Sequence, residues 1–326
     1  MDTEKLLKAF TPEETQELVA ALPANVLTDE VVRRGIEIPV AVGATATHGA
    51  EVSQETGEEQ AFRSQVGRFL DAETRLDVTE QLSVMGEFWG KLGHVVPELS
   101  EDQQAKLAKV AEAHPLHRVV PTPLLSLAER KAVAEKARSF PGQKFSTSDD
   151  ALLTPDESWV YGKLLRNPES TVEEGRKSYG LRYKTEDGGL VSRSEYVAHL
   201  KENGQAVEAE DGTVWTFPVM DVRVHTKRTR DTAGNLHKLV DTIATPESLV
   251  ATQLLHQANG TPNPQWEVDF ANEAIYELTS KREATKKLVG VASIRWYPDR
   301  CRVCLSRWNA DFQRGDFGVR GAESGL

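Results

Sequence analysis

The hydrophobic positions of the first 140 residues recur at the three- and four-residue spacing of amphipathic helices. Two such stripes are clear: Phe62, Val66, Phe69 and Leu70, and then Leu82, Met85, Phe88, Trp89 and Leu92. The pattern predicts helices there, another opened by a Ser100/Gln103 capping box, and one over Leu125–Ser139. Further upstream it predicts a helix from Thr11 to Pro23 and a short strand over Ile36–Val42.

After Lys144 the spacing changes to short alternating runs separated by turn residues. Leu181–Tyr183 and Leu190–Val191 flank a Glu-Asp-Gly-Gly turn, and Asp211-Gly212 separates two further short strands. Helix starts recur at Thr154, at Ser192 with Glu195, and at Thr245-Pro246. Trp266–Leu288 is expected to be helical and Val289–Tyr297 to be a strand. The fold class is therefore α+β, with a mostly helical N-terminal part, 1–143, and a mixed part with antiparallel hairpins, 144–326.

The clearest local pattern spans Val219–Ala244. Met220, Val222 and Val224 alternate with ionisable residues, which predicts a strand with one apolar and one charged face. Asp231–Asn235 is the expected reversal and Leu236–Ile243 the return strand, a register that puts His225 and Asp241 on one face. The charged face makes a basic segment that can contact phosphates; it comprises Arg223, His225, Lys227, Arg228 and Arg230. The alternative is the ordinary solvated face of an antiparallel sheet.

Charge is distributed unevenly along the chain. Of 39 basic and 50 acidic residues, 24 basic and 38 acidic precede Arg223, whereas 15 basic and 12 acidic follow from Arg223 onward. The C-terminal end also interleaves cations with aromatic rings, a composition that suits single-stranded nucleic acid. These residues are Arg295, Trp296, Arg300, Arg302, Arg307 and Trp308. The glycine-rich run Gln313–Gly321 that follows is expected to be a frayed terminus.

The only two cysteines, Cys301 and Cys304, form a C-x-x-C pair. Such a pair can supply two zinc ligands, with the others coming from distant histidines such as His225, His237 or His256. A redox pair at the start of a helix and two unreactive thiols beside a buried turn are the alternatives. His114 and His117 flank Pro115 and are expected to form a loop pair, not a metal site. No glycine-rich phosphate loop or nucleophile elbow is present in the sequence.

These patterns leave three functional classes open. A nucleic-acid-associated protein is favoured by the basic segment and the Trp/Arg-rich end. A structural or assembly protein would act through the acidic helical half, binding a protein partner or a second copy of itself. An enzyme of unidentified reaction is the third, with no cofactor expected apart from zinc. With no apolar run long enough to span a membrane, no export signal and two cysteines, a cytoplasmic location and no membrane partner are expected.

Overall fold

The computed structural model describes residues 57–140, 144–146, 162–223, 231–238, 244–260, 268–280, 283–297, 302–315 and 317–326. They belong to one compact unit, Glu55–Leu326. The helix predicted over Thr11–Pro23 and the strand predicted over Ile36–Val42 lie outside the described residues. So does most of the helix expected after Thr154, of which only 162–166 are described, as helix.

The helical N-terminal part is confirmed for the described residues. It contains α4 (Gly57–Leu70), α5 (Val78–Lys91), α6 (Glu101–Ala113) and α7 (Leu127–Ala137). The predicted capping box is present on α6, where the Ser100 hydroxyl accepts from Gln103 N and the Gln103 side chain accepts from Ser100 N. The stripes read from the sequence face inward, since Phe62, Val66, Phe69 and Phe88 are all 5 % exposed or less.

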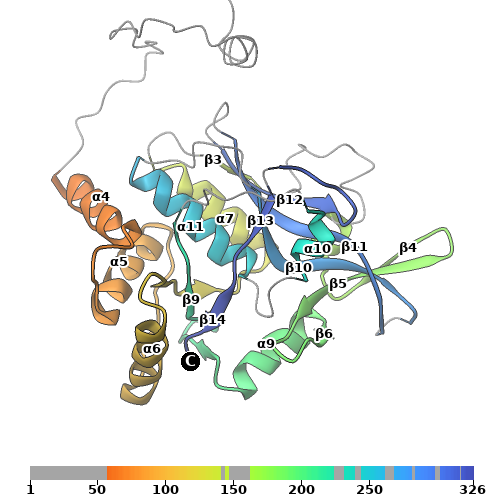
Figure 1. Ribbon diagram of the computed structural model, residues 1–326, viewed down its shortest axis with the longest axis horizontal. Helices are drawn as coiled ribbons and strands as arrows, with labels where there is room; N and C mark the ends of the chain where they lie inside the picture. Colours follow the sequence, from red (N-terminus) through yellow and green to blue (C-terminus); the bar gives the residue numbers. More distant parts are fainter. Residues whose placement is uncertain are drawn as a thin grey trace, which may run out of the picture. The chain divides into compact units, whose positions relative to one another are not determined.

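The mixed part is built around a large sheet with the strand order β3-β12-β11-β10-β5-β4. In chain order its strands are β3 (Lys144–Ser146), β4 (Thr171–Glu174), β5 (Lys177–Lys184), β6 (Leu190–Val191), β10 (Val268–Leu278), β11 (Ala284–Tyr297), β12 (Arg302–Asn309) and β13 (Phe317–Val319). One edge of β10 pairs with β11, while its other edge pairs with β13 in parallel and with β5 in antiparallel orientation. β10 is therefore hydrogen-bonded on both sides (Figure 1).

Two three-stranded sheets complete the strand structure. One has the order β1 (Arg118–Val119), β9 (Pro218–Met220), β14 (Ala322–Ser324), and the other the order β2 (Thr122–Pro123), β8 (Val214–Thr216), β7 (Ala206–Glu208). The predicted turn at Asp211-Gly212 joins β7 to β8, and Gly212 has a φ of 82°, a conformation that glycine adopts without steric cost. The predicted hairpin of β5 and β6 is also present. It leads into α9 (Arg193–Glu202), whose Ser192/Glu195 capping box is confirmed.

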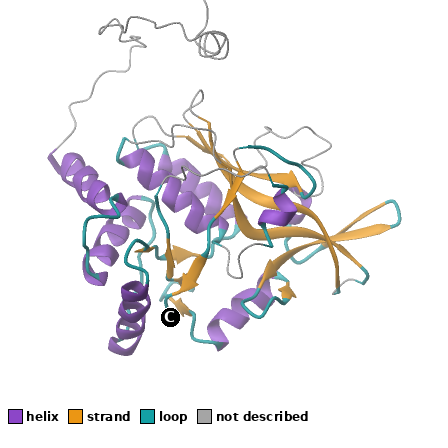
Figure 2. Cartoon of the chain, viewed as in Figure 1, coloured by secondary structure: helices purple, strands orange, loops and turns teal. Residues whose placement is uncertain are grey.

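Helix α11 (Pro246–Ala258) lies inside the molecule, and its residues from Pro246 to His256 are all buried. It begins at the predicted Thr245 cap and contacts α4, β10, β11 and β12 (Figure 2). One hydrophobic cluster extends from Phe62 in α4 to Ala322 in β14. The α+β class is thus confirmed, and this core crosses residue 143, where the sequence predicts a domain boundary.

The prediction of a helix over Trp266–Leu288 is wrong where the structure describes it. Residues 268–278 form β10 and residues 284–288 belong to β11. Asp269, Asn272 and Glu273 give the segment a helix-like polar spacing, yet all three are buried, at 2 % exposed or less. Each of them makes a hydrogen bond to a residue distant in sequence, so the contacts made in the folded molecule outweigh the local preference.

The predicted hairpin over Val219–Ala244 also needs correction. β9 ends at Met220 and pairs with β1 and β14, and the expected reversal is instead a short helix, α10 (Ala233–Leu236). Thr232 caps α10 by accepting a hydrogen bond from Asn235 N, a local bond that competes with a hairpin turn. The predicted His225–Asp241 pairing lies outside the described residues.

The expectation of a frayed C-terminus is wrong as well. Within Gln313–Gly321, Phe317–Val319 form β13 beside β10, and Phe317 and Arg320 are 1 % and 2 % exposed. The free energy gained by burying the Phe317 ring and the paired Arg320 offsets the conformational entropy that the neighbouring glycines lose when this segment is ordered. Within the part of the chain that the structure covers, no helix has the length and apolar character needed to cross a membrane.

Candidate functional site

Arg223 is the one residue of the predicted basic segment that the structure describes. Its Nε and Nη2 donate to Asp221 Oδ1 and Oδ2 at 2.9 and 2.6 Å, so the two side chains form a bidentate pair. Burial would raise the pKa of Asp221, but the hydrogen bonds and charge of Arg223 bring that pKa below its usual value. The Arg223 side chain remains 48 % exposed. His225, Lys227, Arg228 and Arg230 lie outside the described residues.

Arg295 and Arg307, the two arginines of the C-terminal cluster whose side chains the structure describes, do not share a surface. Arg295 and Arg307 are 4 % and 7 % exposed, so neither presents its guanidinium group to solvent. In the β11–β12 register Arg295 is opposite Cys304, and Arg307 is opposite Ala292. Residues 304 and 307 are an odd number of positions apart, so the two arginines point to opposite faces of the sheet. Arg300 and the side chains of Trp296 and Arg302 are not described.

Trp308 belongs instead to a partly exposed aromatic group. Its ring stacks on Phe312, with centroids 4.9 Å apart and planes 20° apart, and meets Phe317 edge-on at 5.5 Å. The guanidinium carbon of Arg314 lies 5.5 Å from the Trp308 ring centroid. Phe312 is 44 % exposed, whereas most large apolar side chains that the structure describes are buried or partly buried. We call Trp308, Phe312, Arg314 and Phe317 the aromatic ledge.

Local structure explains how the ledge forms. β12 ends at Asn309, and Phe312 N donates to Asn309 O at 3.0 Å, which closes a turn and returns Phe312 over Trp308. The Phe312 carbonyl in turn accepts from Ala233 N at 3.0 Å, and Thr232 forms a bridge with Gln313. The ledge is therefore attached to the start of α10.

The residues on both sides of the basic segment contact the C-terminal segment. On one side Thr232 and Ala233 contact the ledge, as described above. On the other side Arg320 Nη1 donates to the carbonyl oxygens of Asp221 and Arg223 at 2.9 and 2.6 Å. Arg320 is held by Asp269 of β10, with Nε to Oδ2 at 2.9 Å. Arg223, the first residue of the basic segment, is thus joined to Arg320, and Thr232, which follows the segment, is joined to Gln313.

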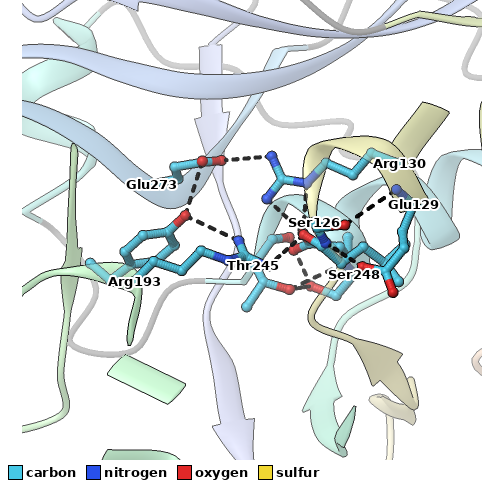
Figure 3. A network of polar contacts seen from close by, with 10 residues as sticks. Ser126, Glu129, Arg130, Arg193, Thr245, Ser248 and Glu273 are labelled. Carbon is cyan, nitrogen blue, oxygen red and sulfur yellow. Dashed lines mark hydrogen bonds and ion pairs between the residues drawn. The ribbon is translucent and has the colours of Figure 1, made fainter. Parts of the chain in front are cut away.

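A second group of polar residues lies inside the molecule and was not found from the sequence (Figure 3). Arg130 of α7 contacts Glu247 of α11, with Nη2 to Oε1 at 2.6 Å, and Glu273 of β10, with Nη1 to Oε2 at 3.3 Å. The Tyr183 hydroxyl donates to Glu273 Oε1 at 3.0 Å, and Arg193 Nη1 donates to that hydroxyl at 3.4 Å. Burial, followed by the charge of Glu273, raises the pKa of Tyr183.

This buried network has the residue types of an acid–base site but no room for a substrate. The cavity beside Arg130 and Glu247 has a volume of about 10 Å³, which is the size of a single water. The side chains of the network come from five elements, α7, α11, β10, β5 and α9, so no motif of fixed spacing in the sequence indicates it. The geometry is that of a structural charge cluster.

The metal prediction at Cys301 and Cys304 receives no support from the described residues. Cys304 is buried in β12 with 2 % of its residue surface exposed, and Cys301 is not described. Nowhere in the described ranges do three His, Cys, Asp or Glu residues gather as a metal site. His114 and His117 stack with ring centroids 5.1 Å apart, between the end of α6 and β1, as expected for a loop pair.

Comparisons of the chain with protein-family models, with curated proteins and with solved structures found no match.

Proposed function

We propose that the protein binds single-stranded nucleic acid through the aromatic ledge together with the adjoining basic segment. The observation that carries the proposal is the exposed Phe312 ring, stacked on Trp308 and flanked by Arg314. A base of any type can stack on such a ring, so binding does not depend on the nucleotide sequence, and each stack contributes about 1–3 kcal/mol. The ligand is single-stranded because a duplex keeps the faces of its bases covered.

The phosphates would be bound by Arg314 and by the cations of the basic segment. Arg314 is part of the ledge, and the chain between Arg223 and Asp231 carries His225, Lys227, Arg228 and Arg230. Arg295 and Arg307 are left out of this interface because they are buried. With a net charge of −11, the protein as a whole repels nucleic acid, so binding depends on this local concentration of positive charge.

Fluorescence anisotropy with a fluorescein-labelled oligothymidylate tests the proposal. Phe312→Ala should weaken binding by roughly 5- to 160-fold, the range that corresponds to one lost base stack. Phe312→Trp should retain binding, because it keeps a stacking surface. Leu116→Ala is the matched control, since Leu116 is also a large apolar residue, 47 % exposed, between α6 and β1 and not part of the ledge.

The charge contribution is tested separately. Arg228→Glu with Arg230→Glu should reduce affinity and flatten its dependence on salt, because fewer counterions are released on binding. Melting temperatures confirm that each variant is folded. Oligothymidylate binding that is unchanged in both Phe312→Ala and the double charge reversal would refute the proposal.

A further inference from the structure

A separate cavity of about 310 Å³ opens where four helix ends meet. Its lining residues come from the first turns of α4, the end of α5, the residues after α7 and the end of α11. None of its described lining residues belongs to the aromatic ledge or to the basic segment. Its volume falls at the lower end of the range for small-molecule sites in proteins.

The walls of this cavity are aromatic. Phe62 and Phe140 both line it, with ring centroids 6.4 Å apart and planes 22° apart, and Phe140 also stacks on Phe88 at 5.9 Å. Phe62 and Phe140 are 5 % and 4 % exposed, so their positions are fixed by the core. Because these two rings are flat and held in place, the cavity beside them is suited to binding a flat apolar group of a ligand.

The polar groups around the cavity are mostly hydrogen-bond donors. Lys91 Nζ lies 4.7 Å from the centroid of the Phe62 ring, and Arg63, whose Nε donates to Asn259 O at 3.3 Å, is a second lining cation. Gln257 also lines the cavity, and its Nε2 is buried with no hydrogen-bond partner in the structure as described. Buried donors normally have acceptors, so an acceptor from a ligand would complete this group.

Two carboxylates near the cavity offset part of the positive charge of Lys91 and Arg63, but the hydrogen-bond donors that line the cavity remain. Glu59 lines the cavity, and Glu87 lies 3.8 Å from Lys91 Nζ in an exposed i,i+4 pair. Such a pair is weak and leaves the ammonium group available to a ligand. We propose that the cavity binds a small aromatic anion, with its ring against Phe62 and Phe140 and its acidic group near Lys91 and Gln257.

Isothermal titration calorimetry of the whole protein with three related compounds tests both halves of this proposal. 2-Naphthoate has the ring and the charge, 2-naphthamide keeps the ring without the charge, and decahydro-2-naphthoate keeps the charge without an aromatic ring. The cavity should bind 2-naphthoate best. Equal or tighter binding of either analogue would overturn the assignment of an aromatic anion.

Variants locate the binding. Lys91→Met keeps the aliphatic stem and should weaken 2-naphthoate about five-fold, as expected for one solvent-screened charge. Ala258→Leu should abolish binding by filling the cavity, and the melting temperature shows whether that variant is folded. Lys109→Met, an exposed lysine of α6 outside the cavity, is the control and should bind normally. Unchanged affinity in the Lys91 variant and in a folded Ala258 variant would refute the site, and neither result bears on nucleic-acid binding.

Discussion

Replacing Arg130 by methionine should strongly destabilise the protein. The guanidinium group makes three contacts in the buried network: Nε and Nη2 with Glu247 Oε1 at 2.8 and 2.6 Å, and Nη1 with Glu273 Oε2 at 3.3 Å. The two carboxylates have side-chain exposures of 4 % and 1 %. Methionine fills a similar volume but leaves both carboxylates buried without this cation.

The expected loss is about 3–5 kcal/mol of unfolding free energy, the usual cost of leaving one side of a buried ion pair without its partner. For a unit of this size the melting temperature should fall by roughly 6–20 °C. Urea denaturation followed by tryptophan fluorescence is a suitable assay, because Trp89 and Trp215 are each 1 % exposed and will report unfolding. Trp89 also lines the small cavity beside Arg130.

A surface pair provides the matched control. Arg138 and Glu135 lie 3.3 Å apart with side-chain exposures of 64 % and 67 %, so Arg138→Met should cost less than about 1 kcal/mol. Combining Arg130→Met with Glu247→Gln and Glu273→Gln should recover part of the loss, because the uncompensated charges are removed. If Arg130→Met and Arg138→Met prove equally mild, the network does not act as a buried charge cluster.

Two further predictions concern the buried histidines and the C-terminus. Burial lowers the pKa of His237 and of His256 to about 4, so the unfolded chain takes up protons before the folded one, and unfolding free energy should rise with pH between about 4 and 6.5. His256→Gln, which keeps a donor to the Val222 carbonyl that His256 Nε2 contacts at 2.6 Å, should flatten this rise in urea titrations across that range, and an equally steep profile would contradict the reasoning. Arg320→Met should cost about 3–5 kcal/mol in the same assay by leaving Asp269 buried without its cation. A loss below 1 kcal/mol would show that the terminus is held by other contacts.

The helices were predictable because their signals are local. The Ser100/Gln103 and Ser192/Glu195 boxes each bring a side chain to a backbone group three residues away, and both occur in the structure. The apolar stripe of α5 likewise fixes its buried face without reference to the rest of the fold. Such features depend on spacing along the chain, which a sequence displays directly.

The strand β10 was missed because its determinants are distant in sequence. Its burial on both faces removes the alternation that marks a half-exposed strand. Asp269 and Glu273 suggest an exposed polar segment, whereas their partners, Arg320 and Arg130, are 51 and 143 residues away. The C-terminus is likewise expected to fray because Arg320 is far in sequence from its partner Asp269, and no residue near Arg320 in the sequence indicates that pairing.

The candidate binding surface was predictable only in part. Composition points to Trp308 and the arginine-rich end of the chain but not to Phe312 or Arg314, because the position of these two residues depends on the turn after β12. Composition groups Arg295 with Arg307, although the register of β11 and β12 places them on opposite faces of the sheet. For two residues on paired strands, the strand register shows whether their side chains share a face of the sheet, which the number of charged residues in the segment does not.

The structure also ties the candidate surface to the buried charges. β10 carries Asp269, which holds Arg320, and Arg320 in turn holds the carbonyl groups of Asp221 and Arg223. Arg223 immediately precedes the other cations of the basic segment, so Arg320→Met should disturb nucleic-acid binding as well as stability. Phe312→Ala, by contrast, removes a stacking surface and leaves these contacts in place. If the two variants are compared under conditions where both are folded, affinity that depends on Phe312 but not on Arg320 would assign recognition to the ledge alone, and equal dependence would require the basic segment to be correctly positioned.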